Sequence, residues 1–310
     1  MTAVADNAPR FRENTDHVES WFVRANDPAS PRAVWLKRTV LCRRDGTTVT
    51  EAWISVFDGT RTAAYRREER LGLDLTAGGG RSAGTLGDVS WDLAFTRDPG
   101  PLGEPMSLLP SARMVDAPFP KNKLLSPFPV ATFAGGLRWG AETWDLDGWV
   151  GMEGHNWGAA HSPEYAWGQC VFPEQGAVVE AASGRIELGS RTSPLFSMLV
   201  VRVGDVEHRF DRIVDRWRQR PDLDFPRWTL GMRGRAGRAR LEMTADPAAM
   251  VCLGYDNPAR PRSYCLNSKT ARVRLSVEPR RGAPFELTSE HGGALEFLRP
   301  DPVAEVQPVV

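Results

Sequence analysis

Cysteine is scarce in this sequence and is never closely paired. The 310 residues include only four cysteines, with no C-x-x-C pair: Cys42, Cys170, Cys252 and Cys265. Zinc sites and disulfide frameworks both need cysteines at characteristic close spacings or in large number. Neither is therefore indicated, and we expect free, mostly buried thiols in a cytoplasmic protein.

An excess of charge of either sign is lacking as well. Lys plus Arg and Asp plus Glu amount to 39 each, so no global field favours a nucleic acid or an anionic membrane as partner. No apolar run approaches the roughly 20 residues of a membrane helix. The first residues, MTAVADNAPRFRENTDH, contain no apolar stretch typical of a signal peptide. We expect no integral membrane segment, and the oligomeric state stays open.

Helical periodicity is also rare. Only Phe210, Ile213, Val214 and Trp217, which precede Pro221, follow the i, i+3, i+4, i+7 spacing and predict one short helix. Alternation of apolar and polar residues with period two dominates elsewhere, which predicts strands with one buried and one wet face. The clearest examples are residues 89–95, 226–233, 239–243 and 270–277.

Other segments are apolar on both faces and come in hairpin pairs. Residues 33–42 and 52–57 are separated by an Asp-Gly turn signal, and residues 195–203 and 206–210 by Gly204-Asp205. A strand that is apolar on both faces suits a barrel wall with a lumen inside and a second layer outside. Each half of the chain has such a pair, followed by an alternating strand with Trp91 or Trp228. We therefore predict two antiparallel β-barrels of similar build.

Eight prolines lie between Pro99 and Pro129. Proline cannot donate to a strand ladder, so this density predicts a long, irregular, ordered loop without strands. We expect the loop to cap the mouth of a barrel.

Imidazole and indole concentrate in Gly151-Met-Glu-Gly-His-Asn-Trp-Gly158 and in the residues that follow, to Gln169. On a strand, residues two apart share a face. Glu153, His155 and Trp157 then point one way, opposite to Met152, Gly154 and Asn156. Tyr165, Trp167 and Gln169 share a face of the next strand. A carboxyl or imidazole acid beside an apolar pocket can protonate an alkene, and indole faces stabilise the cation that forms.

Four segments carry a resemblance to a known group of proteins: ESWFVRANDP (19–28), AVWLKRT (33–39), GMEGHNWGAAHSPEYAWGQ (151–169) and YCLNSK (264–269). In this order they resemble the tandem lipocalin-like superfamily of carotenoid 1,2-hydratases (hydroxyneurosporene synthases), AttH-like proteins, tocopherol cyclase relatives and Svf1-like proteins. The resemblance implies an all-β fold of two antiparallel lipocalin-like barrels in tandem, residues 12–160 and 161–310, with at most one or two short helices. It also implies a shared apolar ligand cavity.

The resemblance further implies chemistry without a metal or organic cofactor. The hydratases and cyclases protonate an alkene, and water or an internal hydroxyl captures the cation. His155 and Trp157 match the His-x-Trp element of the hydratases. Their following strand carries a carboxylate and a Tyr, but here GAVVEAASG (176–184) has no Tyr and only Glu180 for the acid. The candidate catalytic residues are His155, Glu153 and Glu180. The candidate ligand-binding residues are Glu19, Trp21, Asn156, Trp157, Tyr165, Trp167 and Gln169.

Two interpretations of the segment stay open. His155 and Asn156 can bond to backbone groups at a junction between barrels, with Trp157 and Trp167 plugging barrel ends; or they can serve a ligand. A metal site of Glu153, His155 and His161 matches no standard spacing, so we expect none. The predicted function is binding, with acid-catalysed hydration or cyclisation, of an apolar isoprenoid- or lipid-like molecule in a Trp-lined cavity. The alternative is a non-catalytic lipid or terpenoid carrier or a stress-related binding protein.

Overall fold

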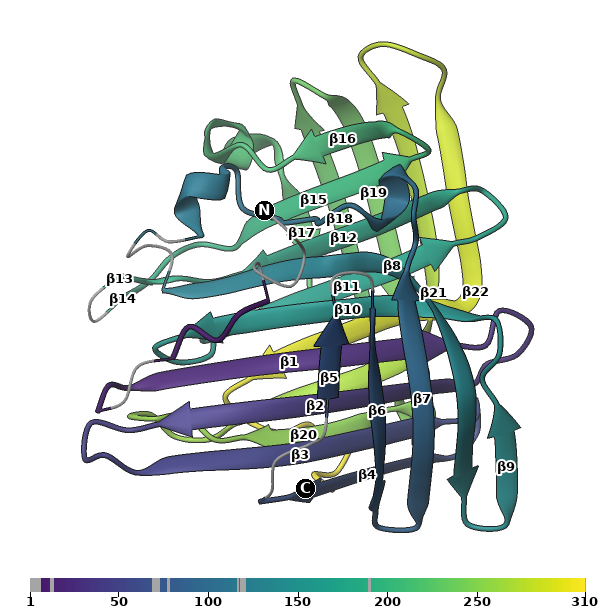
Figure 1. Cartoon of the computed structure of the whole chain (residues 1–310). Coiled ribbons are helices and arrows are strands. Elements are labelled where there is room, and N and C mark those ends of the chain that lie inside the picture. Colours follow the sequence, from purple (N-terminus) through teal and green to yellow (C-terminus); the bar gives the residue numbers. More distant parts are fainter. Residues whose placement is uncertain are drawn as a thin grey trace.

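The computed structural model describes residues 7–11, 14–68, 73–76, 79–115, 117, 121–188 and 191–309. Two large antiparallel sheets make up most of this part of the chain, and each curls on itself (Figure 1). The all-β fold expected from the alternating pattern is therefore confirmed. The four cysteines are buried and free, as their spacing predicts.

The first sheet has the strand order β4-β3-β2-β1-β10-β8-β7-β6-β5, with β9 paired to β8. In Figure 1, β5, β6 and β7 cross in front of β1, β2 and β3, so the sheet folds over its own inner face. Its strands are β1 (His17–Asn26), β2 (Ala33–Cys42), β3 (Thr48–Phe57), β4 (Thr62–Arg67), β5 (Leu73–Thr76), β6 (Gly79–Leu86), β7 (Val89–Arg97), β8 (Asn122–Trp139), β9 (Glu142–Asp145) and β10 (Trp149–Gly158).

The second sheet has the order β16-β15-β12-β11-β22-β21-β19-β18-β17, with β20 paired to β21. Its strands are β11 (Tyr165–Phe172), β12 (Ala177–Gly184), β15 (Phe196–Val203), β16 (Val206–Phe210), β17 (Arg220–Asp222), β18 (Arg227–Gly234), β19 (Gly237–Thr244), β20 (Val251–Tyr255), β21 (Ser263–Pro279) and β22 (Phe285–Arg299). A small separate sheet pairs β13 (Glu187–Leu188) with β14 (Arg191–Thr192).

The two sheets repeat one plan. In each, the first four strands form a meander, β1 to β4 in one sheet and β11, β12, β15 and β16 in the other. The first strand of the meander pairs with the last strand of the sheet, β10 or β22, and the remaining strands follow from there in reverse sequence order. This agrees with the similar build predicted for the two halves. The first sheet ends at Gly158 and the second begins at Tyr165, so the predicted boundary between residues 160 and 161 falls in the link between them. Residue 12, the predicted start of the first domain, lies outside the described residues.

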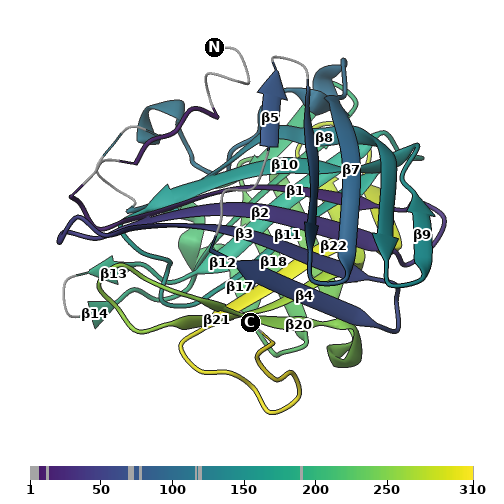
Figure 2. The same ribbon diagram turned by 60° about the horizontal axis from the view of Figure 1, so that its bottom comes forward.

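Three of the four apolar cores of the described residues explain why the strands of the wall are apolar on both faces, and the fourth is a small group around Trp21, Val40 and Cys42. One core fills the first barrel and includes Leu36, Trp91 and Phe133. A second fills the second barrel around Leu230 and Val273. The third lies between the barrels, where the outer faces of β1–β3 and β10 pack on those of β11, β12, β20, β21 and β22 (Figure 2). The inner face of each wall is thus buried in its own barrel, and the outer face is buried against the other barrel.

Helical structure is confined to short 3₁₀ segments within the described residues: η1 (Pro101–Gly103), η2 (Ala112–Met114), η3 (Ile213–Arg218) and η4 (Pro247–Ala249). The predicted short helix is η3. Its apolar spacing is typical of a helix with one face on a core, but the structure differs: Ile213, Val214 and Trp217 are exposed.

The proline-rich segment is only partly a loop. The prediction of no strand up to Pro129 is wrong, because β8 begins at Asn122 and includes Pro127 and Pro129. The ladder between β8 and β10 shifts register on either side of Glu153. Proline has no N–H to donate to a neighbouring strand. It is tolerated in β8 because, at such register shifts, not every backbone N–H is needed for the ladder.

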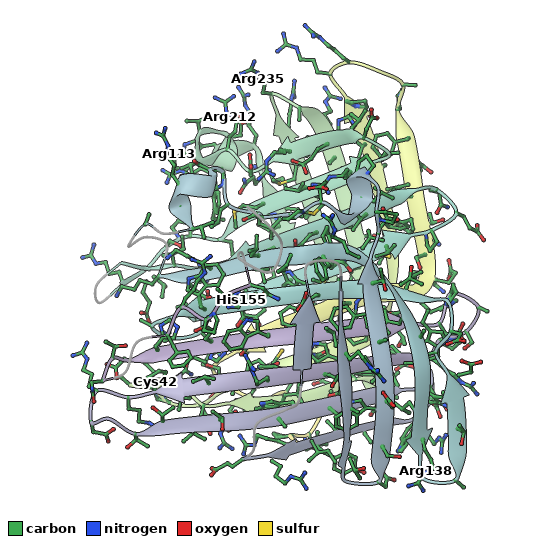
Figure 3. The ribbon with its side chains drawn as sticks, viewed as in Figure 1. Cys42, Arg113, Arg138, His155, Arg212 and Arg235 are labelled. Atoms are coloured by element: carbon green, nitrogen blue, oxygen red, sulfur yellow. The ribbon has the colours of Figure 1, made fainter. Side chains whose placement is uncertain are left out.

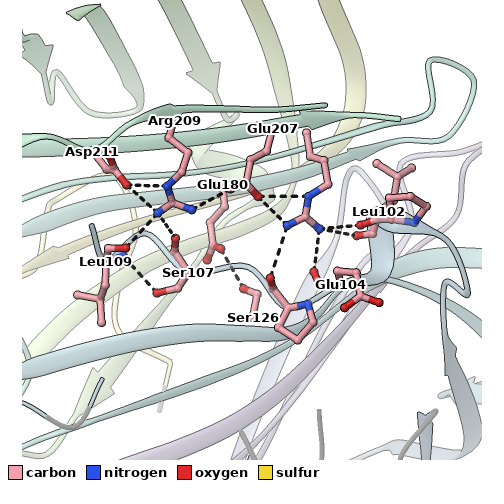
Figure 4. A network of polar contacts seen from close by, with 12 residues as sticks. Leu102, Glu104, Ser107, Leu109, Ser126, Glu180, Glu207, Arg209 and Asp211 are labelled. Carbon is pink, nitrogen blue, oxygen red and sulfur yellow. Dashed lines mark hydrogen bonds and ion pairs between the residues drawn. The ribbon is translucent and has the colours of Figure 1, made fainter. Parts of the chain in front are cut away.

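The preceding loop, in its described residues 98–115, bonds to the second barrel, and its expected position over a barrel mouth stays a prediction. The buried Arg202 of β15 donates from Nη1 to the carbonyl oxygens of Pro101 and Glu104, both at 2.8 Å, and from Nη2 to Glu207 at 2.6 Å. Arg209 of β16 donates to the carbonyl oxygens of Ser107 (2.8 Å) and Leu109 (3.0 Å). Figure 4 shows this network. Two guanidinium groups thus connect the loop of one barrel to the sheet of the other.

Replacing Arg202 should destabilise the protein. In Arg202→Met, several buried carbonyl oxygens and Glu207 lose their donor, so we expect the free energy of unfolding to fall by about 2–4 kcal/mol. Guanidinium unfolding followed by tryptophan fluorescence measures the change. Arg138→Met, at an exposed arginine, should change stability by less than about 0.5 kcal/mol. A loss in Arg202→Met no larger than this control would contradict the docking role.

Candidate functional site

The HNWG segment forms part of β10 and pairs with β1. Trp21 lies opposite His155, Glu19 opposite Trp157, and Val23 opposite Glu153. These side chains face the interior of the first barrel, as the neighbouring Val23 in its core shows. Met152 and Asn156 face the second barrel, in agreement with the period-two prediction. Gly154 is required on that face, since a Cβ there would come within 2.2 Å of the Phe22 ring.

We call the buried group of Glu19, Trp21, Glu153, His155 and Trp157 the barrel cluster. His155 Nε2 lies 2.8 Å from Glu19 Oε1. The His155 ring stacks on Trp21, with centroids 4.8 Å apart and planes at 16°, and lies 4.7 Å from the Trp157 ring. Glu19, Glu153 and His155 all have an exposed fraction of 0%.

The N-terminal segment supplies further partners to the barrel cluster. Asn7 Nδ2 donates to Glu153 Oε1 at 2.7 Å, and the Asn7 carbonyl oxygen accepts from Trp21 Nε1 at 2.8 Å. The backbone N–H of Arg10 donates to Glu19 Oε1 at 2.8 Å. The Arg10 guanidinium lies over the Trp157 ring, 4.5 Å from its centroid. Residues 7–10 therefore cover the cluster.

The two carboxyl groups of the cluster differ in charge. Burial opposes ionisation of Glu19, but hydrogen bonds from His155 and His17 outweigh it and lower the pKa to about 2. Burial raises the pKa of Glu153 to about 8, against a small opposing effect of Asn7. At neutral pH, Glu19 is a carboxylate and Glu153 a neutral acid.

A cavity of about 830 Å³ lies on the other side of this wall, between the two barrels. We call it the interbarrel cavity. Aromatic side chains from both sheets form its walls, namely those of Phe22, Trp35, Tyr165, Trp167 and Tyr255. The loop before β8 adds Leu108, Leu109 and Met114. Exposed Ile213 and Trp217 also border the cavity, so it opens to solvent at that end.

The buried end of the cavity holds charged groups. Lys269 Nζ donates to Glu296 Oε1 at 2.6 Å, and Asn267 Nδ2 donates to the same oxygen at 3.0 Å. Tyr165 donates from its hydroxyl to Glu296 Oε2 at 3.4 Å. Burial raises the pKa of Glu296 and the Lys269 ammonium lowers it, with a net decrease, whereas burial lowers the pKa of Lys269 although Glu296 opposes this effect.

Lys37 is a buried ammonium at the cavity wall itself, with an exposed fraction of 3%. Its Nζ lies 3.5 Å from the centroid of Tyr255 and 5.1 Å from that of Trp53. Among the described residues it makes cation–π contacts but no hydrogen bond or ion pair within 4 Å. Burial lowers the pKa of Lys37 to about 8, although Glu296 and Glu51 oppose this effect.

His161 belongs to the cavity wall and not to the barrel cluster. Its backbone N–H and Nδ1 both lie 3.0 Å from Asn257 Oδ1, and its ring stacks on Tyr255. Burial and, to a smaller extent, the Lys37 ammonium lower the pKa of His161 to about 3. His161 is therefore neutral at physiological pH and positions Tyr255.

The predicted site residues fall into three separate places. His155, Glu153, Glu19, Trp21 and Trp157 form the barrel cluster. Asn156, Tyr165 and Trp167 line the interbarrel cavity. Glu180 and Gln169 lie buried between the sheets.

Glu180 and Gln169 form hydrogen bonds with neighbouring protein groups. Glu180 accepts hydrogen bonds from Trp167 Nε1 at 3.1 Å and from Ser126 at 3.0 Å (Figure 4). Burial raises the pKa of Glu180 to about 7, and these two donors oppose the rise. Gln169 accepts from Arg24 and donates to the Pro129 carbonyl oxygen. The predicted trio His155, Glu153 and Glu180 is therefore not brought together, and its catalytic role stays a prediction.

Sequence reasoning missed Lys37, Lys269 and Glu296 as a group. A usable signal is the lysine in the middle of AVWLKRTVLC, a strand otherwise apolar on both faces. A charge at such a position has to be buried, and a buried charge is rare unless it is paired or functional.

No group of three or more His, Cys, Asp or Glu side chains in the described part of the chain is arranged to hold a metal ion. No helix there has the length and apolar character to cross a bilayer.

Comparison with known sequences gives distant relatives. No family model matches the chain. It is 23% identical over 289 residues to an uncharacterised protein of Mycobacterium tuberculosis, present in two strains. That alignment covers 87% of this chain and 84% of the relative.

Solved structures share the fold at low identity. Kievitone hydratase from Nectria haematococca has a TM-score of 0.54 at 12% identity, covering 93% of this chain and 90% of its own. An AttH-type protein from Nitrosomonas europaea gives 0.55 at 11% identity, covering 92% of each chain. CghA gives 0.50 at 12% identity, covering 92% of this chain and 88% of its own. The tandem lipocalin-like fold expected from the HNWG segment is thus confirmed.

The neutral state of Glu153 makes a testable contribution to pH dependence. The unfolded carboxyl ionises above pH 4.5, whereas the folded one holds its proton to about pH 8. The unfolded state therefore binds fewer protons in this window, and stability falls as pH rises through it. Glu153→Gln keeps an acceptor for Asn7 and cannot ionise, so it should be more stable than the wild type at pH 8, by up to about 4 kcal/mol.

Urea unfolding of both proteins between pH 4.5 and 8 measures this difference. The advantage of Glu153→Gln should be smallest near pH 4.5 and should grow with pH. As a control, Glu174→Gln at an exposed glutamate should follow the wild-type curve. Parallel curves for wild type and Glu153→Gln would show that Glu153 is ionised in the fold.

Proposed function

We propose that this tandem lipocalin-like protein binds an apolar, isoprenoid- or lipid-like small molecule with one oxygen-bearing end in the interbarrel cavity. The observation that carries the proposal is the cavity itself, about 830 Å³ in volume and walled by aromatic side chains from both sheets. Pockets for small organic ligands measure roughly 300–1,000 Å³ and combine apolar walls with a few polar groups. Residues of the N-terminal segment and of the loop before β8 line the rim of the cavity, and a ligand can enter at the end bordered by Ile213 and Trp217.

The polar end of the ligand is inferred from Lys37. Lys269 and Glu296 form an ion pair at 2.6 Å, whereas Lys37 lies at the cavity wall with cation–π contacts and only the longer-range attraction of Glu296 and Glu51. A buried ammonium is costly unless hydrogen bonds or an opposite charge compensate it. A carboxylate, enolate or phenolate oxygen on the ligand supplies that compensation, and the apolar remainder lies along Trp35, Trp167 and Phe22.

The proposal predicts a charge-selective loss in Lys37→Met. Binding of retinoic acid should weaken about tenfold or more, because a hydrogen bond to a charged group is lost. Binding of retinol, which has the same chain and no charge, should change little. Quenching of tryptophan fluorescence in a titration measures both affinities.

Two comparisons make this test specific. Lys121→Gln, at an exposed lysine on the cavity rim, should alter neither affinity by more than about twofold, because a solvated charge contributes little. The fold of Lys37→Met is checked by its unfolding curve, which should show equal or greater stability after removal of a buried charge. Equal weakening for both ligands would disprove the role of Lys37, and no quenching by either would count against an apolar ligand.

A second candidate function is hydration or cyclisation of an alkene in the same cavity, as the shared fold with kievitone hydratase suggests. Lys37, with a pKa of about 8, is protonated at neutral pH and faces the cavity. A proton passes from its Nζ to one alkene carbon, and the indole faces of Trp35 and Trp167 stabilise the cation on the other. Water adds there and returns a proton to Lys37; an internal hydroxyl in place of water closes a ring.

This candidate predicts a product heavier than the substrate by one water, detected by mass spectrometry after incubation with prenylated phenols or acyclic isoprenoid alkenes. Lys37→Met should abolish product formation while retinol binding persists. Cyclisation leaves the mass unchanged and shifts the chromatographic retention. Full turnover in Lys37→Met together with loss in a folded His155→Ala would instead assign the chemistry to the barrel cluster.

A further inference from the structure

Three large apolar side chains stand in solvent on η3. The exposed fractions are 54% for Ile213, 67% for Val214 and 74% for Trp217. Most of the other large apolar side chains of the described residues lie in a core, so their concentration on one short segment is unusual. Tryptophan at a surface of this kind suits the boundary between water and hydrocarbon, because its ring is apolar and its N–H polar.

Arginines surround these side chains. Residues 212–220, RIVDRWRQR, contain four arginines and one aspartate, and all four arginines are exposed. The aspartate, Asp215, faces Arg218 at 3.8 Å. Arg212 also lines a small hollow with Arg233 and Arg235 of the β18–β19 hairpin, against which η3 packs. Figure 3 places Arg212 and Arg235 at the same edge of the molecule.

The same segment borders the interbarrel cavity. Ile213, Arg216 and Trp217 line its open end, whereas Val214 does not. Arg216 lies over the Trp217 ring, 4.3 Å from its centroid. The exposed apolar side chains, the positive charge and the entrance to the cavity are therefore in one place.

We propose that η3 is a docking surface for an anionic phospholipid bilayer. Ile213, Val214 and Trp217 enter the headgroup boundary, and Arg212, Arg216, Arg218, Arg233 and Arg235 contact lipid phosphates and carboxylates. The entrance of the interbarrel cavity then faces the membrane. The protein as a whole is neutral, with 39 basic and 39 acidic side chains, so the attraction comes from the local arrangement of charge.

The chemistry of the surface favours a bilayer over a folded protein partner. A stable protein interface buries about 1,200–2,000 Å² in total, with a continuous apolar centre. Here three apolar side chains project from one turn and are ringed by arginines, which is the pattern of an interfacial membrane anchor. An apolar ligand can also pass between bilayer and cavity without crossing water.

The experiment is co-sedimentation of the full chain with vesicles of phosphatidylcholine, with and without phosphatidylserine. We expect binding to the phosphatidylserine vesicles, weakened by added salt. Val214→Asp and Arg212→Glu should each lower this affinity by at least about fivefold, because each charge near an anionic surface contributes about that factor. Neither residue lines the cavity, so retinol quenching in vesicle-free solution should be unchanged in both variants.

Matched controls lie away from η3. Val206→Ser replaces a valine that is 51% exposed, and Arg138→Glu reverses an arginine at the opposite end of the molecule in Figure 3; both should bind vesicles as the wild type does. Absence of wild-type binding, or equal loss in controls and η3 variants, would overturn the proposal. A dimer that Val214→Asp dissociates, without vesicle binding, would assign the surface to self-association instead. Failure of retinol binding with intact vesicle binding would reject only the proposed function.

Discussion

Mutual burial of the outer barrel walls is the constraint on which the rest of this structure depends. Phe22, Trp35 and Trp53 on the first sheet would be exposed in an isolated barrel, as would Trp167 and Leu253 on the second. Exposed apolar area of that extent is unfavourable in water. Each barrel therefore covers the apolar wall of the other, and the interbarrel cavity lies between these two walls.

Burial on this scale also encloses polar groups. Whether such a group has a hydrogen-bond partner in the protein helps to separate a structural role from a role in binding. Arg24 and Gln169 bond to each other across the contact, and Asn26 donates to the Lys269 carbonyl oxygen at 2.6 Å. Each of these side chains makes at least one hydrogen bond to the opposite sheet, although Arg24 Nε and Asn26 Oδ1 have none, and so they fix how the barrels meet. Lys37 lies in the same layer without such a partner within the described residues. The contrast is the physical reason to assign Lys37 to a ligand and the other groups to the fold.

Period two in the sequence was sufficient to predict the strands and the two faces of residues 151–158. It could not predict which face meets the cavity, because both faces of a wall strand are buried and both carry aromatic residues. His155 and Trp157 therefore lie in the barrel cluster, whereas Asn156, between them, lines the interbarrel cavity. The surroundings of Lys37 could not be predicted for a related reason, since its nearest aromatic neighbour, Tyr255, comes from the other sheet and lies more than 200 residues away in the sequence.

The same alternation explains how the HNWG segment can affect the interbarrel cavity although His155 does not line it. His155 bonds to Glu19 and stacks on Trp21, and both partners belong to β1. This contact holds β10 and β1 together from inside the first barrel. The opposite faces of these two strands carry Asn156 and Phe22, which form part of the cavity wall. The buried His–Glu contact on one side of this strand pair therefore supports the cavity wall on the other, and the motif needs no chemical step of its own to matter there.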